Sequence, residues 1–534
     1  MENPEAQIDK NHFNVNDSAA KCYKYRNVGQ IFYAVDGNKY YHFGIDKEIM
    51  GKHKLICKFD PVEKAINDGG SVLVYTTKAS IYNKRVFSKF ERYINMCPEI
   101  NDKDAKKYIK QIKKYIGAND NSGEERYSQM IDLMNHGIVI HHGSLPLQAR
   151  LILEKFTNAG YCKICFATST LEQGINMPFD VVYLNTFEAS KQLSLKNLIG
   201  RAGRSTLKQE FDFGSIVVKK SNMTQLRNII NSPDMLENVS MLESEVEDDL
   251  KEFKDAIIND TISDEYNISE KQLNKLRDEN SENIVKNILN TMFQHDVLVS
   301  LISINEDQEC KLLLYEYFEQ LYEYYLGRTL NNGEKNVFDT AIKILLWQIH
   351  CKSFKDICFY RYSYASKKQE REQLQKEIKN GNEFESYIVN LKLQHLQAQF
   401  VTGYAEIPNK SLQVFSMFGN NEIKAIDVDY DRIVFDTYDY LDKIIGFKLS
   451  DIFYASFNEY FEKTNDLRAK RMAQLVKCGT EDEKKIMMLR YGFSFEDMEW
   501  LEPYIKKINQ EEIVFSREIK KLPIEKMDII KRFI

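Results

Sequence analysis

Residues 163–169 read KICFATS, an apolar run that ends abruptly in two hydroxyl side chains. Four other stretches of the first half have the same form, with β-branched or aromatic residues bounded by turn or polar residues. These are SVLVYTT (71–77), GIVIHHG (137–143), VVYLNT (181–186) and GSIVVKK (214–220). Short, nearly continuous apolar runs are typical of strands that are buried on both faces. The five stretches therefore predict strands of a parallel sheet.

Helices are expected between these strands, at 78–95, 104–117, 126–136 and 145–158. In the last segment one face is apolar at helical spacing, from Leu145 through Ala149 to Phe156. Strands that alternate with helices imply a sheet covered on both faces. Residues 60–225 thus predict one doubly wound α/β lobe.

The regions on either side of this lobe differ from it. Residues 30–45 read QIFYAVDGNKYYHFGI, which predicts a β-hairpin turning at Asp36-Gly37 ahead of the lobe. Six of the nine prolines precede residue 241, so the remainder of the chain is expected to be mostly helical. The predicted domains are 1–59 (end of a preceding lobe and hairpin), 60–240 (the α/β lobe), 241–360 (helical, winged-helix-like) and 361–534 (helical).

Composition narrows the functional classes. A chain of 534 residues is long enough for several domains, and its 43% hydrophobic and 28% charged content is ordinary for a globular protein. A net charge of −6 means that nucleic acid would have to bind along a local basic track. No apolar run reaches eighteen residues, so no membrane span is expected. The polar N-terminus and nine cysteines without framework spacing predict reduced thiols and a cytoplasmic protein.

Three predicted strands end in residues suited to phosphate contacts. VYTTK (74–78) ends in Thr76 and Thr77, and IVIHHGSL (138–145) in His141, His142 and Gly143. CFATSTLEQGINMP (165–178) ends in Thr168, Ser169 and Thr170, with Gly174 and Asn176 beyond. Ligands of α/β sheets bind at the carboxyl ends of strands. Taken singly, however, hydroxyls after a strand are more often turn or helix-cap residues, and His141 and His142 are expected to face opposite ways.

In this order the motifs are more specific. HHGSLPLQAR, ATSTLEQGINMP and NLIGRAGR, preceded by VLVYTTK, resemble the second RecA-like lobe of superfamily-two helicases, in particular the superkiller-like (Ski-like) DExH group. There the pattern is a HHAG-type strand end, a TSTLAxGVNLP-type motif V and a QxxGRAGR motif VI, with motif IV upstream. Asn197 stands where this family usually has Gln, and the shorter amide has less reach.

The resemblance implies a role for each matching position. Arg201 and Arg204 would be arginine fingers that reach the γ-phosphate of ATP bound with Mg²⁺, although a surface salt-bridge pair is the plainer reading of two arginines. Asn197, Gly200, Gly174 and Asn176 would lie at the nucleotide, with Asn176 near the ribose. The backbone of a single-stranded RNA or DNA track would meet the remaining positions, Thr76, Thr77, His141, Gly143, Thr168, Ser169 and Thr170.

The other half of such a motor has no counterpart in this sequence. No GxxxxGK[ST] phosphate loop occurs, and no DExH run follows an apolar strand. The chain opens MENPEAQ, similar to the xxNPEE segment that follows the SAT motif in the Ski-like family. The expectation is a first RecA-like lobe on another chain or in a missing N-terminal part, and no ATP hydrolysis by this chain alone.

Three further features are interpreted structurally. Cys162 and Cys165 form a single CxxC around one strand, where odd spacing predicts side chains on opposite faces, so no metal site is expected. Tyr315, Phe318, Tyr322 and Tyr325 recur at helical spacing and predict a core stripe. CFYRYSYASKK (358–368) has a composition that suits single-strand binding, but a helix that packs its aromatic side chains inward is favoured.

Two functions remain open from the sequence. The first is the C-terminal half of an ATP-dependent helicase or translocase. The alternative is a non-catalytic nucleic-acid-binding or scaffold subunit. Ski-like helicases also occur in anti-phage defence systems such as the Hachiman type, and a role of that kind rests on analogy with the family alone.

Overall fold

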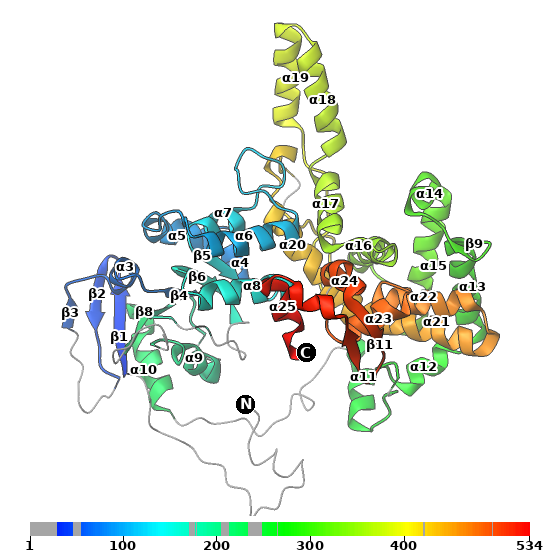
Figure 1. The fold of residues 1–534 in the computed structure, drawn as a ribbon, viewed down its shortest axis with the longest axis horizontal. Coiled ribbons are helices and arrows are strands. Elements are labelled where there is room, and N and C mark those ends of the chain that lie inside the picture. Colours follow the sequence, from blue (N-terminus) through cyan, green and yellow to red (C-terminus); the bar gives the residue numbers. More distant parts are fainter. Residues whose placement is uncertain are drawn as a thin grey trace, which may run out of the picture. The chain divides into compact units, whose positions relative to one another are not determined.

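The computed structural model describes residues 29–45, 55–169, 177, 179–188, 190–203, 213–232, 248–263, 265–419, 422–493 and 495–533 (Figure 1). These form two compact units. The first comprises the described residues up to 232 together with 429–435, and the second comprises those from 248 to 428 and from 436 onward.

The first unit is built on one eight-stranded sheet with the order β3-β2-β1-β8-β7-β4-β6-β5. The pairs from β1 to β5 in this order are parallel, whereas β2 and β3 are antiparallel to their neighbours. The strands are β1 (Gly29–Asp36), β2 (Lys39–His42), β3 (Leu55–Cys57), β4 (Val72–Tyr75), β5 (Ile138–His141), β6 (Ile164–Ala167), β7 (Val181–Leu184) and β8 (Phe213–Lys219). The five strands predicted from apolar runs are β4 to β8, and the RecA-like parallel lobe is confirmed.

Burial explains why these strands could be recognised. Every residue of β4, β5, β6 and β7 is buried, so no position needs a polar side chain. The helices of this unit are α3 (Pro61–Asn67), α4 (Lys78–Tyr82), α5 (Arg85–Ile94), α6 (Lys103–Ile116), α7 (Gln129–Asn135), α8 (Leu147–Asn158), α9 (Gln192–Ile199) and α10 (Met223–Asn231). The expected helix at 78–95 is broken in two, because Lys84 adopts the left-handed conformation with a φ of 57°.

The predicted hairpin is present but belongs to the same sheet as the lobe. Asp36 pairs with Lys39 across the turn, and Gly37 supplies the positive φ of 58° that the turn requires. β1 pairs in parallel with β8, from Gly29 opposite Phe213 to Val35 opposite Lys219. The sequence placed the hairpin ahead of the lobe because pairing between segments this far apart leaves no local pattern.

The second unit is largely helical, as expected. Its longer helices are α11 (Asp248–Ile258), α13 (Glu279–Met292), α15 (Gln308–Leu326), α16 (Asn332–Ile349), α17 (Phe354–Ala365), α18 (Lys368–Asn380), α19 (Glu383–His395), α21 (Ser450–Thr464) and α22 (Leu467–Cys478). Shorter helices are α12 (Glu270–Leu276), α14 (Leu301–Glu306), α23 (Glu483–Arg490), α24 (Phe495–Leu501) and α25 (Ile524–Ile530). Two small hairpins, β9 (Phe293–Gln294) with β10 (Val297–Leu298) and β11 (Ile505–Ile508) with β12 (Ile513–Phe515), complete it.

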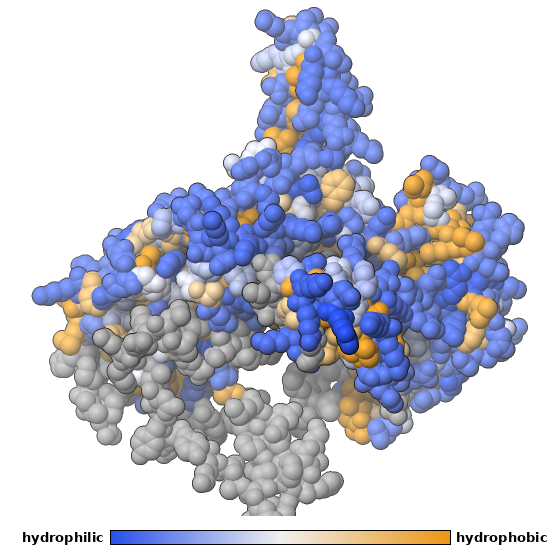
Figure 2. All heavy atoms as spheres, in the orientation of Figure 1, coloured by the Kyte–Doolittle hydropathy of each residue, from blue (hydrophilic) through white to orange (hydrophobic). Residues whose placement is uncertain are grey.

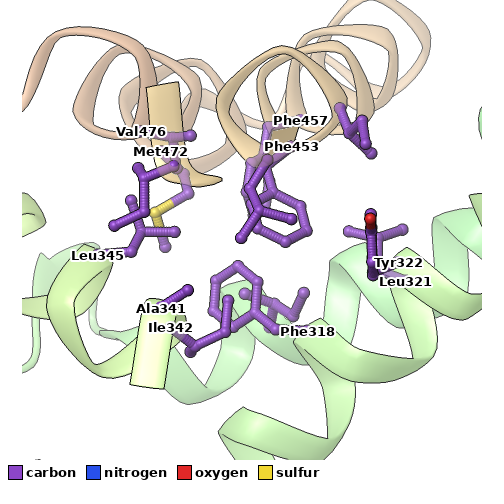
Figure 3. Close-up of a cluster of buried hydrophobic side chains, with 14 of the residues drawn as sticks. Phe318, Leu321, Tyr322, Ala341, Ile342, Leu345, Phe453, Phe457, Met472 and Val476 are labelled. Atoms are coloured by element: carbon purple, nitrogen blue, oxygen red, sulfur yellow. The ribbon is translucent and has the colours of Figure 1, made fainter. Parts of the chain in front are cut away.

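An aromatic core holds this unit together (Figure 3). Phe318 and Tyr322 of α15 lie near Phe453 and Phe457 of α21, and the rings of Phe318 and Phe453 are 5.1 Å apart. The predicted stripe on α15 is confirmed, since Phe318, Tyr322 and Tyr325 are buried and Tyr315 packs against the same core. This core runs from Tyr266 to Val476, and residues on both sides of the boundary expected at 360/361 contribute to it.

The segment CFYRYSYASKK forms the predicted helix, but of its four aromatic side chains only Tyr362 is buried, and Tyr364 is 44% exposed. Cys358, Tyr362 and Ala365 of α17 are buried, and the guanidinium of Arg361 lies 2.8 Å from the carboxylate of Asp436. Arg361 is only 3% exposed and its Nη1 also donates to Thr437 Oγ1 at 3.0 Å. In the part of the chain that the structure describes, no helix is long and apolar enough to span a membrane.

Candidate functional site

Three of the predicted strand ends meet at one edge of the sheet. β6 lies between β4 and β5, and Ala167 at its end pairs with Tyr75 on one side and His141 on the other. The backbone N–H of Thr76 donates to the Ala167 carbonyl at 2.8 Å, and that of Thr168 donates to the His141 carbonyl at 3.3 Å. The hydroxyls and the glycine that the sequence singled out therefore lie side by side.

The two threonines after β4 differ in what they can offer a ligand. Thr76 is buried, and its Oγ1 accepts a hydrogen bond from Asn185 Nδ2 at 3.1 Å. Thr77 is exposed and caps α4, its Oγ1 accepting from the N–H of Ser80 at 3.1 Å. Thr77 therefore acts as a helix cap, which is the more common role of a hydroxyl that follows a strand.

Asn185 and Lys89 belong to this edge and were missed by the sequence reasoning. Lys89 Nζ donates to Asn185 Oδ1 at 2.5 Å, so Thr76, Asn185 and Lys89 form one chain of polar contacts. Burial, and then the charge of Lys219, lower the pKa of Lys89. Asn185 ends a predicted strand and could have been selected on that basis, whereas Lys89 lies within α5 and carries no local signal.

Both histidines after β5 are fully buried. His141 Nε2 lies 3.6 Å from Glu154 Oε1 of α8. His142 Nδ1 accepts a hydrogen bond from the N–H of Ser144 at 3.1 Å, and its ring packs against Tyr82 and Phe435. Gly143 is half-buried, so a ligand at this strand end would meet its backbone more readily than either imidazole.

The residues after β6 are only partly described. Thr168 is 8% exposed and Ser169 is exposed. Thr170, Gly174 and Asn176 lie outside the described residues, as does Arg204. Among the described residues of this edge, Ser169 and Thr77 are therefore the predicted contacts whose hydroxyl-bearing side chains are exposed.

The segment after α9 is held at the opposite edge of the sheet. Gln30 Nε2 of β1 donates to the Ile199 carbonyl at 3.0 Å. The N–H of Gly203 donates to the Phe179 carbonyl at 2.8 Å, and Gly203 has a φ of 77°. At Gly214 a β-carbon would lie 2.4 Å from the backbone of Ala202, so β8 and this loop can approach only because that residue is glycine.

Arg201 therefore sits near the amino ends of β1, β7 and β8, away from the strand ends that carry Thr76, Gly143 and Thr168. Its side chain is 7% exposed. Asn197 is exposed on α9, and Gly200 forms the C-cap of that helix. Those predicted site residues that the structure describes thus lie in two groups, at opposite ends of the parallel strands.

A remote segment packs against the strand-end edge. Residues 429–435 include the start of α20 (Tyr430–Asp439) and belong to the first unit. Asp431 Oδ1 accepts from Ser128 Oγ at 2.5 Å, and Oδ2 accepts from the N–H of Met130 at 2.9 Å. The Phe435 ring stacks on Tyr82, with centroids 5.5 Å apart, and meets His142 at 4.3 Å. About 300 residues separate these partners in the sequence, so no local pattern predicted the contact.

The cysteines of the CxxC meet, in contrast to the prediction that they face opposite ways. Cys162 lies before β6 rather than in it, so strand alternation does not apply to the pair. A hydrogen bond with Cys162, followed by burial, raises the pKa of Cys165. A thiol with a raised pKa is a poor metal ligand, and among the described residues no group of three or more His, Cys, Asp or Glu is arranged to hold a metal ion.

Comparison with known proteins supports the first unit's assignment. Residues 88–206 match the family model described as "Helicase conserved C-terminal domain". ATP-dependent DNA helicase Hel308 of Caldivirga maquilingensis is 24% identical over 177 residues, or 31% of this chain and 22% of that protein. Probable ATP-dependent DNA helicase HFM1 of Mus musculus is 28% identical over 127 residues, or 22% of this chain and 9% of that protein.

Hachiman protein HamB of Bacillus cereus is 26% identical over 175 residues, which is 32% of this chain and 15% of that protein. The chain thus spans less than a quarter of the length of each of these three curated relatives. A solved structure of S. cerevisiae Dbp5 bound to RNA and ADP BeF3 aligns with a TM-score of 0.20 and 18% identity, covering 32% of this chain and 34% of that one. Residues 88–206 are therefore similar to helicase C-terminal domains, and these relatives match at low identity and over part of the chain.

Proposed function

We propose that this protein supplies the second RecA-like lobe of an ATP-dependent nucleic-acid helicase or translocase. The observation that supports the proposal is that the described candidate residues lie at the two ends of the parallel strands of one sheet. The strand ends at Thr77, Gly143 and Ser169 form one surface, and the loop with Arg201 forms another. A motor that couples ATP hydrolysis to movement along a nucleic-acid strand needs one surface for the nucleotide and one for the strand on the same rigid lobe.

The chain's own residues would act as follows. Exposed hydroxyls and the Gly143 backbone would contact the phosphates of a single strand of RNA or DNA, with Lys89 adding positive charge at the same edge. Arg201 and Arg204 would stabilise the charge that develops on the transferred phosphoryl group. Gly174 and Asn176, with Asn197 and Gly200 beside the arginines, would border the nucleotide.

ATP and Mg²⁺ would be held mainly by a first RecA-like lobe, since these 534 residues contain no phosphate loop. That lobe would lie on another chain or in another part of a longer protein. We expect this chain alone to show no ATP hydrolysis. The similarity to HamB extends the proposal to anti-phage defence as the setting in which the motor acts.

A scaffold that binds nucleic acid without meeting ATP is the second candidate. The observation that favours it is the burial of Arg201, whose side chain would have to turn outward to reach a phosphate. Nucleic-acid binding alone would need only the strand-end surface.

Complementation separates the two candidates. The chain is combined with a first lobe that has intact Walker motifs, and nucleic-acid-stimulated ATP hydrolysis is measured. We expect Arg204→Ala to lower the rate by about 10³-fold or more, as removal of an arginine finger does. Arg92→Ala, which removes an exposed arginine paired with Glu63 in the same lobe, is the matched control and should leave the rate unchanged.

An unchanged rate in Arg204→Ala would show that the arginine assignment is wrong. Nucleic-acid binding that persists without any stimulated hydrolysis, with the first lobe present and folded, would instead support the scaffold.

A further inference from the structure

The helical hairpin of α18 and α19 carries an apolar face that no other described part of the chain covers. The two helices pack side by side (Figure 1). The hydroxyl of Ser386 on α19 donates to the Ile378 carbonyl of α18 at 2.8 Å. The α19 N-terminus is closed by a capping box between Asn382 and Glu385. Ser386, Val389 and Leu393 lie on the half-buried side of α19.

The opposite side of α19 is exposed and apolar. Phe384 is 73% exposed and Tyr387 61%, while Leu391 is 41% and Ile388 36% exposed. Their spacing of three, four and seven residues places all four on one face of the helix. Figure 2 shows apolar surface along this hairpin. With aromatic side chains contributing most, the patch exposes about 400–500 Å², a size that marks interaction sites on soluble proteins.

The charges of the hairpin argue against nucleic acid as the occupant. A nucleic-acid track needs an excess of Lys and Arg. Between 368 and 395 the basic residues equal the acidic ones: Lys368, Arg371, Lys376, Lys379 and Lys392 against Glu370, Glu372, Glu377, Glu383 and Glu385. An amphipathic helix that presents its own apolar face fits this surface better.

The stripe on α19 is complementary to itself. Read from either end, the apolar positions have the same spacing, so a second α19 laid antiparallel places Phe384 on Leu391 and Tyr387 on Ile388. Glu385 and Lys392 lie seven residues apart, about two turns, on the same flank of the stripe. In the antiparallel arrangement Glu385 of each copy faces Lys392 of the other, and two-fold symmetry repeats the pair.

We propose that this surface binds a second copy of the chain, with the two α19 helices packed antiparallel through their apolar faces. The contact would bury about 800–1,000 Å² in total, below the area of most stable dimers. The dimer therefore forms and dissociates with concentration.

Sedimentation velocity on the full chain across a range of concentrations tests the proposal. The wild type should pass from monomer to dimer as concentration rises. Phe384→Ser/Tyr387→Ser should remain monomeric. Lys392→Glu should raise the dissociation constant by about tenfold or more, because like charges then face each other twice. Lys376→Glu, the same charge change on the exposed side of α18, is the matched control and should dimerise as the wild type does.

A charge swap makes the test specific to antiparallel pairing. Glu385→Lys/Lys392→Glu restores opposite charges in every copy and should dimerise more tightly than Lys392→Glu. Because Glu385 also closes the capping box, far-UV circular dichroism must show that the double variant keeps the helicity of the wild type. A wild type that stays monomeric at every concentration overturns the proposal. A dimer whose dissociation constant is the same in the wild type and in these variants also overturns the proposal. So does a Phe384→Ser/Tyr387→Ser variant that loses single-strand binding while it sediments with the same mass as the wild type.

Discussion

The two units of this protein are stabilised in different ways. In the first unit, strands such as β5 and β6 are buried along their whole length. Their residues are apolar except for His141 at the end of β5 and the thiol of Cys165 in β6. In the second, large aromatic side chains of α15 and α21 fill the core, and a charged pair, Arg361 with Asp436, is buried beside it. The core of the first unit is thus made mainly by buried strands, and that of the second by aromatic side chains beside a buried charged pair.

The largest effect is expected from breaking the buried pair. Asp436→Ala leaves the Arg361 guanidinium buried without its carboxylate and frees the N–H of Tyr404, which donates to Asp436 Oδ1 at 2.6 Å. We expect the second unit to lose about 3–5 kcal/mol of its free energy of unfolding. Both tryptophans, Trp347 and Trp500, lie in this unit, so tryptophan fluorescence during urea unfolding reports on it directly.

The control for that variant is a more exposed pair on the same unit. Lys368 and Glu372 lie 3.2 Å apart at helical spacing, and Glu372→Ala should cost less than about 1 kcal/mol. If Asp436→Ala and Glu372→Ala lowered the free energy of unfolding equally, burial would not determine how much an ion pair contributes to stability.

A smaller effect is expected where two backbones touch in the first unit. Gly214→Ala would place a β-carbon 2.4 Å from Ala202 and should destabilise the lobe by about 1–3 kcal/mol through overpacking. Hydrogen exchange should quicken at the amides of β8 and α9, and the complemented ATPase rate should fall because Arg201 adjoins Ala202. Gly123→Ala is the matched control, since a β-carbon there meets no atom within 4 Å. Unchanged exchange in Gly214→Ala would contradict the steric argument.

A pH dependence is expected at residues 429–435, which pack against the strand-end edge of the first unit. Burial, and then the charge of Asp429, raise the pKa of Asp431 to about 7, while Ser128, Met130 and Lys84 oppose that rise. Because the folded state holds a proton that the unfolded state has lost, the stabilisation is present at acidic pH and is lost as pH rises toward about 7. We expect the free energy of opening this segment to fall as pH rises from about 4 to about 7, the interval between the ordinary pKa of an aspartate and the raised pKa of Asp431.

Asp431→Asn should remove this dependence. Its amide oxygen can still accept a hydrogen bond from Ser128 or Met130, but the side chain no longer titrates. Protection from hydrogen exchange at the α7 amides, corrected for the intrinsic effect of pH, should weaken with rising pH in the wild type and stay level in the variant. A decline that persists in Asp431→Asn would assign the effect to another group.

Patterns among residues close in sequence were enough to predict many of the helices and strands. The apolar runs predicted β4 to β8, and helical spacing predicted the buried stripe that includes Phe318 and Tyr322. Strand direction then brought Thr76, Gly143 and Thr168 together, because parallel neighbours end at the same edge. These features depend on residues close in sequence, and their periodicity records which faces are buried.

Only the tertiary structure decided the rest. Four features leave no periodic signal in the sequence. They are the pairing of β1 with β8, the position of Arg201 at the other edge, the contact of Cys162 with Cys165 and the docking of Asp431 on α7. Each joins segments whose partners are chosen by the way the whole chain packs. A burial pattern shows that a residue is covered, but it does not show by which distant residue. The sequence alone thus determined the elements and the surface that their ends form, and the fold determined how the remaining site residues divide between two edges.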